Sequence, residues 1–112
     1  MIKVVLVDDQ TLVRQGVKSL LSLAESIEVV AEASDGQHAI ELIPTIKPDV
    51  VLMDMRMPVK SGLEAIQELA ALKALPPTII LTTFDDDELV LAGIKAGAKG
   101  YLLKDVSLEQ LV

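Results

Sequence analysis

Residues 48–58, PDVVLMDMRMP, decide the fold of this chain. The apolar run at residues 50–53 does not alternate with polar residues, which predicts a parallel strand buried on both faces. Pro58 cannot continue a strand ladder, so this strand is expected to end close to Asp54. Asp54 is therefore predicted at the carboxyl end of a central strand, and ligands bind at that edge of open α/β sheets.

Composition restricts the class of protein. The chain has 112 residues, of which 51% are hydrophobic and 2% aromatic, so we expect one domain over residues 1–112 with an aliphatic core. The formal net charge of −7 argues against direct binding of nucleic acid, which requires a basic surface. The absence of cysteine excludes disulfides and thiolate metal sites. We find no secretory signal and no apolar segment near the ~20 residues of a membrane helix, so the expected location is the cytoplasm.

The rest of the chain alternates between strand-like and helix-like segments. Apolar runs predict further strands at residues 2–7, 27–33, 78–82 and 100–103, and apolar steps of three and four residues predict helices between them. This alternation indicates right-handed βαβ crossovers and a parallel sheet, although it leaves the order of the strands open. Residues 107–112 provide only about one turn of a fifth helix, which predicts a domain cut from a longer protein.

Local signals predict where the helices begin and end. Thr11 is expected to cap the first helix, while Ser34 and Ser61 each begin a capping box with Gln or Glu three residues later. Pro44 is expected to kink the second helix or end it early. Gly97 is expected to end the fourth.

Polar residues follow four of the five predicted strands: Asp8, Asp9, Asp54, Thr82 and Lys104. If these strands are neighbours, the side chains converge, and carboxylates about 4 Å apart repel by ~4 kcal/mol at an effective dielectric of 20. A hard divalent cation offsets that repulsion, and oxygen ligands select Mg²⁺ or Mn²⁺. With a lysine and a hydroxyl to hold an anion, the set predicts phosphoryl transfer with Asp54 as nucleophile.

These positions, together with Pro58 and Gly62, make the sequence resemble the receiver domain of bacterial two-component response regulators over its whole length. The resemblance implies a flavodoxin-like (βα)5 fold, a doubly wound five-stranded parallel sheet of order 2-1-3-4-5, here with a truncated fifth helix. Residues 81–84 and 100–105 resemble the NarL/LuxR (FixJ-like) branch. Its members usually carry a C-terminal helix-turn-helix output domain, which we expect to be absent from this chain, so DNA would be contacted only through that domain.

The resemblance also implies a role for each site residue. Asp54 would be the phosphoacceptor for a sensor histidine kinase, assisted by Lys104 and Thr82. The implied metal ligands are Asp8, Asp9, Asp54 and the main-chain carbonyl of Arg56, and the implied switch residues are Thr82 and Tyr101. Such a domain catalyses only its own phosphorylation and dephosphorylation.

Phosphorylation would shift the face of the fourth helix, fifth strand and fifth helix, and thereby dimerisation and transcriptional output. The sequence leaves open whether dimers form there or through the first and fifth helices.

Three residues depart from the usual receiver pattern. Asp105 stands where many receivers have proline after the lysine, so a cis peptide there cannot be assumed. Thr83 replaces the small residue common after the switch threonine and would narrow access to Asp54. Arg56 is expected to tune the phosphoryl lifetime, in a direction that the sequence leaves open.

Other functions fit the residues less well. Haloacid-dehalogenase-like phosphatases also use an aspartyl nucleophile, but they place it after the first strand, with a second acid where this chain has Arg56. A flavodoxin-like cofactor binder would need a phosphate loop after the first strand, which is missing, and no tryptophan is present to stack a flavin. A receiver-like interaction module that works without phosphorylation stays open. His38, the single histidine, is expected to be solvated.

Overall fold

The computed structural model describes residues 2–55, 57, 60–82 and 87–103, with only the backbone at residues 102–103. Strands and helices alternate along these residues, in the order β1 (Ile2–Val7), α1 (Thr11–Leu21), β2 (Ile27–Ala33), α2 (Gly36–Ile46), β3 (Val50–Asp54), α3 (Gly62–Ala71), β4 (Thr78–Thr82), α4 (Asp87–Ala96) and β5 (Gly100–Leu103). The predicted fifth helix lies outside the described residues.

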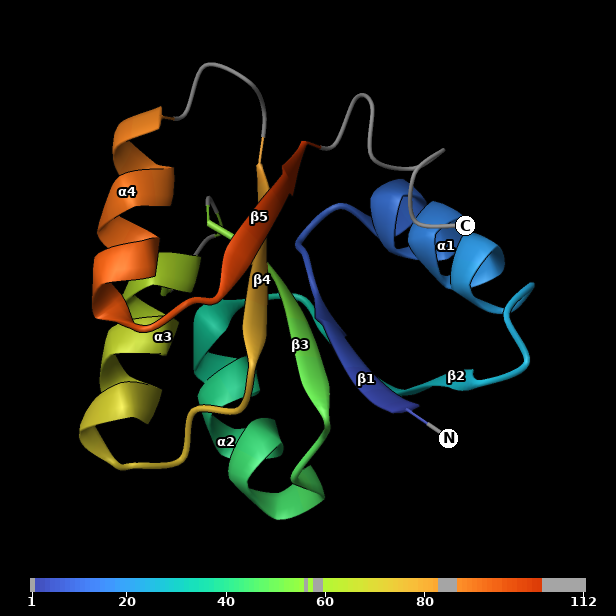
Figure 1. Ribbon diagram of the computed structural model, residues 1–112, viewed down its shortest axis with the longest axis horizontal. Helices are drawn as coiled ribbons and strands as arrows, with labels where there is room; N and C mark the ends of the chain where they lie inside the picture. The colour runs from blue at the N-terminus through green and yellow to red at the C-terminus, as the bar shows by residue number, and fades with distance from the viewer. Residues whose placement is uncertain (1, 56, 58–59, 83–86, 104–112) are drawn as a thin grey trace.

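The five strands form one parallel sheet of order β2-β1-β3-β4-β5. In Figure 1, α1 covers one face of the sheet, while α2, α3 and α4 cover the other. The predicted doubly wound sheet of order 2-1-3-4-5 is confirmed. Since all the strands run the same way, their carboxyl ends meet along one edge of the sheet.

The central strands are buried on both faces, as their apolar runs predict. Successive side chains of a strand point to opposite faces. Val5 and Val7 therefore pack into the core beneath α2, α3 and α4, while Val4 and Leu6 pack with Val17 of α1. Full burial of each such side chain contributes about 1.5–3 kcal/mol to stability.

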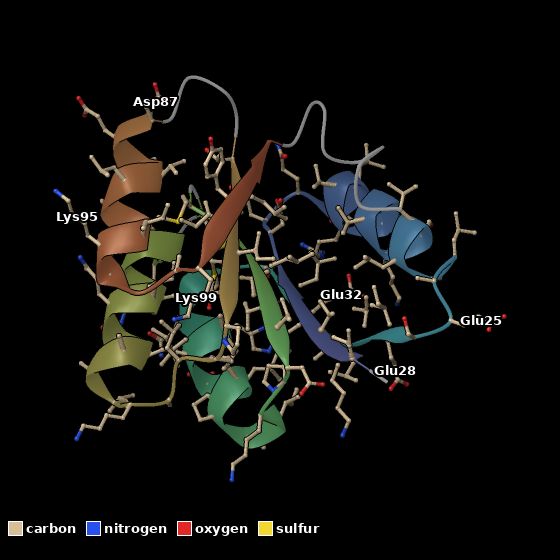
Figure 2. The ribbon with its side chains drawn as sticks, in the orientation of Figure 1. Glu25, Glu28, Glu32, Asp87, Lys95 and Lys99 are labelled. Carbon is tan, nitrogen blue, oxygen red and sulfur yellow. The ribbon has the colours of Figure 1, made fainter. Side chains whose placement is uncertain are left out.

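The edge strand β2 is less buried than the central strands. Glu28 is exposed within it, and Figure 2 shows Glu25 and Glu28 directed away from the body of the domain. Charges on an edge strand discourage pairing with the strands of other molecules.

Two of the predicted helix starts are wrong by one residue. Thr11 is the first residue of α1 rather than its N-cap, and the preceding Gln10 makes no side-chain cap. At α2 the N-cap is Asp35 rather than Ser34, because the Asp35 carboxylate accepts the His38 N–H at 2.8 Å. A carboxylate satisfies the orphan N–H groups of a first turn as well as a hydroxyl does, so adjacent Ser and Asp both fit the pattern.

Pro44 was predicted to kink α2 or to end it early. It lies inside α2, which continues to Ile46, so the early end is wrong. A proline near the end of a helix removes a single hydrogen bond, and Ile43 remains fully buried in the core. The helix ends instead at Lys47, whose left-handed φ of 53° closes the last turn with a 2.9 Å hydrogen bond to the Ile43 carbonyl.

α4 carries charges that complement its dipole. Asp87 and Glu88 lie in its first turn and Lys95 in its last, and Figure 2 shows Asp87 at the beginning of the helix and Lys95 on its outer side. As predicted, Gly97 follows the last residue of the helix, with a φ of 132° that favours glycine. None of the helices in the described part of the chain is long and apolar enough to cross a membrane.

The predicted capping box at Ser61 is confirmed. The Ser61 hydroxyl accepts the Glu64 N–H, and the Glu64 carboxylate accepts the Ser61 N–H, both at 3.2 Å. Replacing Ser61 by alanine should therefore lower the free energy of unfolding by about 1 kcal/mol, measured by urea denaturation. Ser61→Asp keeps an acceptor and is the control that should retain most of the stability. Equal losses in both variants would contradict the capping role.

Candidate functional site

Two neighbouring strands end in carboxylates at the same edge of the sheet. Val7 of β1 pairs with Met53 of β3, so the next residues, Asp8 and Asp54, follow at adjacent positions. One carboxylate oxygen from each of Asp8, Asp9 and Asp54 lies within 4.8 Å of the others. The predicted convergence of these three acids is confirmed, while their chemical roles remain predictions.

The three acids differ in burial, and their negative charges repel one another. Asp8 is 0% exposed and Asp54 is 5% exposed, whereas Asp9 is open to solvent. Two unit charges about 5 Å apart repel by roughly 3 kcal/mol at an effective dielectric of 20. Three hard oxygen donors at this spacing fit Mg²⁺ or Mn²⁺, whose charge would offset the repulsion.

Thr82 belongs to the same edge of the sheet. Asp54 pairs with Leu81 across β3 and β4, so Thr82 stands one position beyond the acceptor candidate, and it is 2% exposed. Tyr101 lies one strand farther, in β5, and is 53% exposed. A buried threonine at the carboxyl end of β4 and an exposed ring on the adjacent strand suit the predicted switch pair.

Several sequence predictions fall outside the residues that the structure describes. They concern Arg56, Pro58, Thr83, Lys104 and Asp105, including the peptide bond between the last two. His38, by contrast, is described, and it is exposed on α2 as predicted.

Backbone hydrogen bonds hold both ends of the loop that follows β3. The N–H of Gly62 donates to the Met55 carbonyl at 3.2 Å, and a Cβ on Gly62 would lie 2.0 Å from the Asp54 carbonyl oxygen. At the other contact, the N–H of Gly36 donates to the Lys60 carbonyl at 2.9 Å. Both glycines permit close approaches that hold the backbone beside Asp54.

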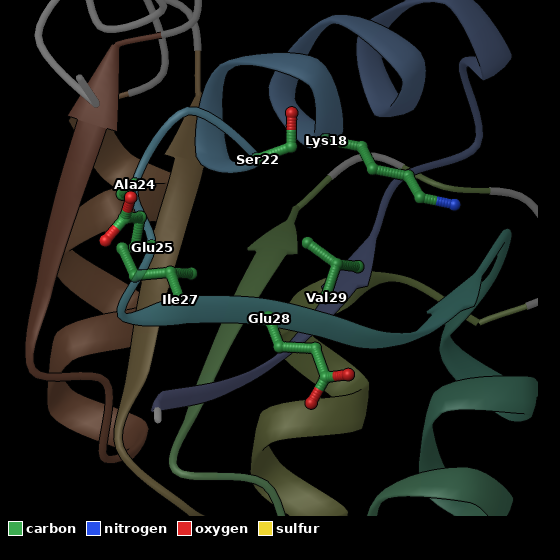
Figure 3. A pocket seen from close by; sticks show the side chains of 7 residues that line it. All are labelled: Lys18, Ser22, Ala24, Glu25, Ile27, Glu28 and Val29. Carbon is green, nitrogen blue, oxygen red and sulfur yellow. The ribbon is translucent and has the colours of Figure 1, made fainter.

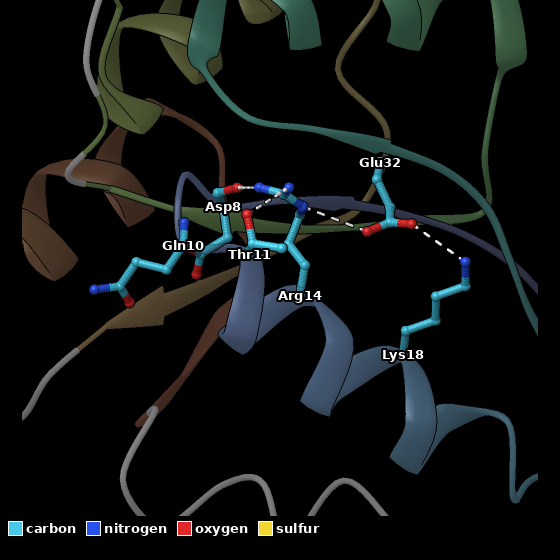
Figure 4. Close-up of polar contacts among 6 residues, drawn as sticks. All are labelled: Asp8, Gln10, Thr11, Arg14, Lys18 and Glu32. Carbon is cyan, nitrogen blue, oxygen red and sulfur yellow. Dashed lines mark hydrogen bonds and ion pairs between the residues drawn. The ribbon is translucent and has the colours of Figure 1, made fainter.

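Arg14 also contacts the acidic site, although no motif in the sequence predicted it. Its guanidinium donates to the main-chain carbonyl of Asp8 and forms an ion pair with Glu32 on β2 (Figure 4). The available signal was a positive charge close to the N-terminus of α1, where the helix dipole disfavours cations. Such a residue indicates a local partner strong enough to offset the dipole.

A hollow of about 270 Å³ lies between the end of α1 and the beginning of β2, where Lys18, Ile27 and Val29 help to line it (Figure 3). It adjoins the amino end of β2, whereas the acids lie at the carboxyl ends of the strands. The hollow is therefore separate from the acidic site.

Known proteins resemble this chain over nearly all of its length. The response regulator receiver domain family matches residues 4–112. The transcriptional regulatory protein LnrK of Bacillus subtilis (strain 168) is 44% identical over 112 residues, which cover 100% of this chain and 51% of LnrK. The chain spans about half the length of the curated relatives it matches.

Solved structures agree with the sequence matches. A receiver domain of NarL from Mycobacterium tuberculosis superimposes with a TM-score of 0.90 at 37% identity, covering 99% of this chain and 90% of that one. A DNA-binding response regulator of the LuxR family from Staphylococcus aureus also gives a TM-score of 0.90, at 30% identity, covering 99% of this chain and 92% of the other. The chain therefore belongs to the response regulator receiver domain family, in its NarL/LuxR branch, and is a signalling domain of a two-component system.

Proposed function

We propose that this domain accepts a phosphoryl group on Asp54 from the phosphohistidine of a sensor histidine kinase, in a reaction that requires Mg²⁺ or Mn²⁺. The observation that carries the proposal is the meeting of Asp8, Asp9 and Asp54 within 4.8 Å at the carboxyl edge of the sheet. Membership of the receiver family supports it.

The chemistry is a displacement at phosphorus. An oxygen of the Asp54 carboxylate attacks, a P–O bond forms, and the P–N bond to the kinase histidine breaks as the imidazole leaves and takes up a proton. The product is an acyl phosphate on Asp54.

The residues around Asp54 would bind the cation and the phosphoryl group. Asp8, Asp9 and Asp54, with the carbonyl of Arg56, would hold the cation, which when bound neutralises charge on the transferring group. Lys104 would bind the same phosphoryl oxygens, and Thr82 would donate its hydroxyl to them. These roles rest on the resemblance and on the positions of Thr82 and the acids at one edge.

Phosphorylation would act on the rest of the domain as an added charge of about −1.5 to −2. Thr82 would move toward the phosphoryl group, and Tyr101, now exposed, would turn inward from β5. That change would alter the face formed by α4, β5 and the predicted fifth helix, and with it homodimerisation. Transcriptional output would follow through an output domain outside this chain.

The alternative is a receiver-like interaction module that works without phosphorylation. Exposed apolar side chains on α4, Leu91 and Ile94, would suit such a partner surface. The two functions differ in one observable, because only the first predicts covalent, metal-dependent modification.

The test is intact-protein mass after incubation with acetyl phosphate and Mg²⁺. We expect a single phosphoryl increment, lost when EDTA replaces Mg²⁺ because the carboxylates then lack their counter-charge. No increment in a folded sample under either condition would contradict phosphoryl transfer and favour the interaction module.

A further inference from the structure

Arg14 joins α1 both to the end of β1 and to the edge strand β2. Its guanidinium donates to the main-chain carbonyl of Asp8, while its Nε lies 3.4 Å from the Glu32 carboxylate. A further guanidinium nitrogen donates to the Thr11 hydroxyl at 3.3 Å. These contacts can be followed in Figure 4. The Arg14 side chain is only 16% exposed, so the guanidinium is held largely away from water.

The direction of the guanidinium is determined by its surroundings. Glu32 is held from both sides, because Lys18 Nζ also lies 3.3 Å from its second carboxylate oxygen. The Arg14 N–H bonds to the Gln10 carbonyl at 3.1 Å, which places the side chain at the beginning of α1. A planar guanidinium with several fixed partners has little freedom to turn.

Asp8 is held through three of its atoms. Its N–H donates to the Ala33 carbonyl at 3.1 Å, and its Oδ1 accepts the Gln10 N–H at 2.8 Å. Its carbonyl, which accepts from Arg14, belongs to the peptide that links Asp8 to Asp9. Of these three contacts, only the one with Arg14 acts on the linking peptide, and the orientation of that peptide determines where the Asp9 side chain begins.

We infer that Arg14 is a positioning residue for the cation site, which orients the Asp8–Asp9 peptide so that both carboxylates meet Asp54. The inference rests on the proposed function, since the cation is the one that phosphoryl transfer would use.

Two simpler roles for Arg14 predict different results. If the guanidinium acted only as a nearby positive charge, it would repel the cation, and its removal would tighten binding. If it only tied α1 to β2, its removal would lower stability and leave the affinity for the cation unchanged.

The test is Mg²⁺ affinity, measured by isothermal titration calorimetry on the full chain and on Arg14→Gln. Positioning predicts an affinity about tenfold weaker, because losing a group that orients metal ligands typically costs this much or more. Arg14→Lys keeps the charge but loses the planar fork, so it too should bind Mg²⁺ more weakly. Phosphorylation by acetyl phosphate should then need more Mg²⁺ for half-maximal rate, with the maximal rate at saturating Mg²⁺ largely kept.

Lys18→Gln is the matched control. It removes the other cation that contacts Glu32 without touching Asp8, so its Mg²⁺ affinity should equal that of the unchanged chain. Equal or tighter Mg²⁺ binding by folded Arg14→Gln overturns the inference. If Arg14→Gln does not fold, Arg14→Lys decides by the same criterion. Absence of Mg²⁺ binding by the unchanged chain would instead overturn the proposed function together with the inference.

Discussion

Asp54→Asn should abolish phosphoryl uptake from acetyl phosphate, with no mass increment above background. The substitution preserves the shape of the side chain but removes the carboxylate oxygen that would attack phosphorus, and an amide oxygen is a far weaker nucleophile. It also removes one of the three negative charges that would hold the cation. Both effects act in the same direction, so we expect a complete loss rather than a slower reaction.

The matched control is Asp49→Asn, just before the amino end of the same strand. Asp49 is exposed, and its carboxylate accepts the Lys3 N–H at 2.8 Å. The asparagine at position 49 can keep that bond through its side-chain oxygen, so uptake should match that of the unchanged chain. Labelling of Asp54→Asn at the normal rate would place the phosphoryl group on another residue.

Gly62→Ala should destabilise the domain by about 3 kcal/mol or more, the upper range for overpacking a tight site. The new Cβ would lie 2.0 Å from the Asp54 carbonyl oxygen and 2.9 Å from the Met55 Cα. Both are backbone atoms, which cannot rotate away as a side chain could. The start of α3 or the end of β3 must therefore move, which should also slow phosphorylation of Asp54. Urea denaturation with and without Mg²⁺ measures the loss.

Gly16→Ala is the control, because it makes the same replacement of glycine by alanine at a position where the new Cβ causes no clash. Gly16 lies within α1, and a Cβ there would meet nothing within 4 Å. Alanine in a helix interior is favoured over glycine by about 1 kcal/mol, so this variant should be more stable than the unchanged chain. A Gly62→Ala variant as stable as Gly16→Ala would show that the end of β3 can shift at little cost.

Much of the fold could be predicted because the pattern of apolar residues along the chain indicates which segments are buried. An uninterrupted apolar run such as residues 50–53 has few outcomes other than a strand covered on both faces. The order of the strands did not follow from alternation and came from the resemblance to receiver domains. The helix starts were less certain, since Asp35 and Ser34 compete for one cap and local preference differs little between them.

The three acids of the candidate site could be predicted from the sequence, but the contact that holds the Asp8 backbone could not. Asp8, Asp9 and Asp54 each follow a strand, and parallel strands end at a common edge, so their meeting required only that β1 and β3 be neighbours. No comparable rule predicts the hydrogen bond from the Arg14 guanidinium to the Asp8 carbonyl. This hydrogen bond depends on the conformation of the Arg14 side chain and on its ion pair with Glu32. Glu32 lies on β2, which is distant from Arg14 in the sequence.

By itself, the sequence determined the alternation of strands and helices, the aliphatic core and the carboxylates at the strand ends, because these follow from local hydrophobic pattern. The tertiary structure alone decided which atoms touch. The close approach of Gly62 to the Asp54 carbonyl and the Arg14 bond at Asp8 arise from the packing of elements far apart in the chain. Contacts of this kind depend on distances of a few ångströms between backbones, and no periodicity along one segment carries that information.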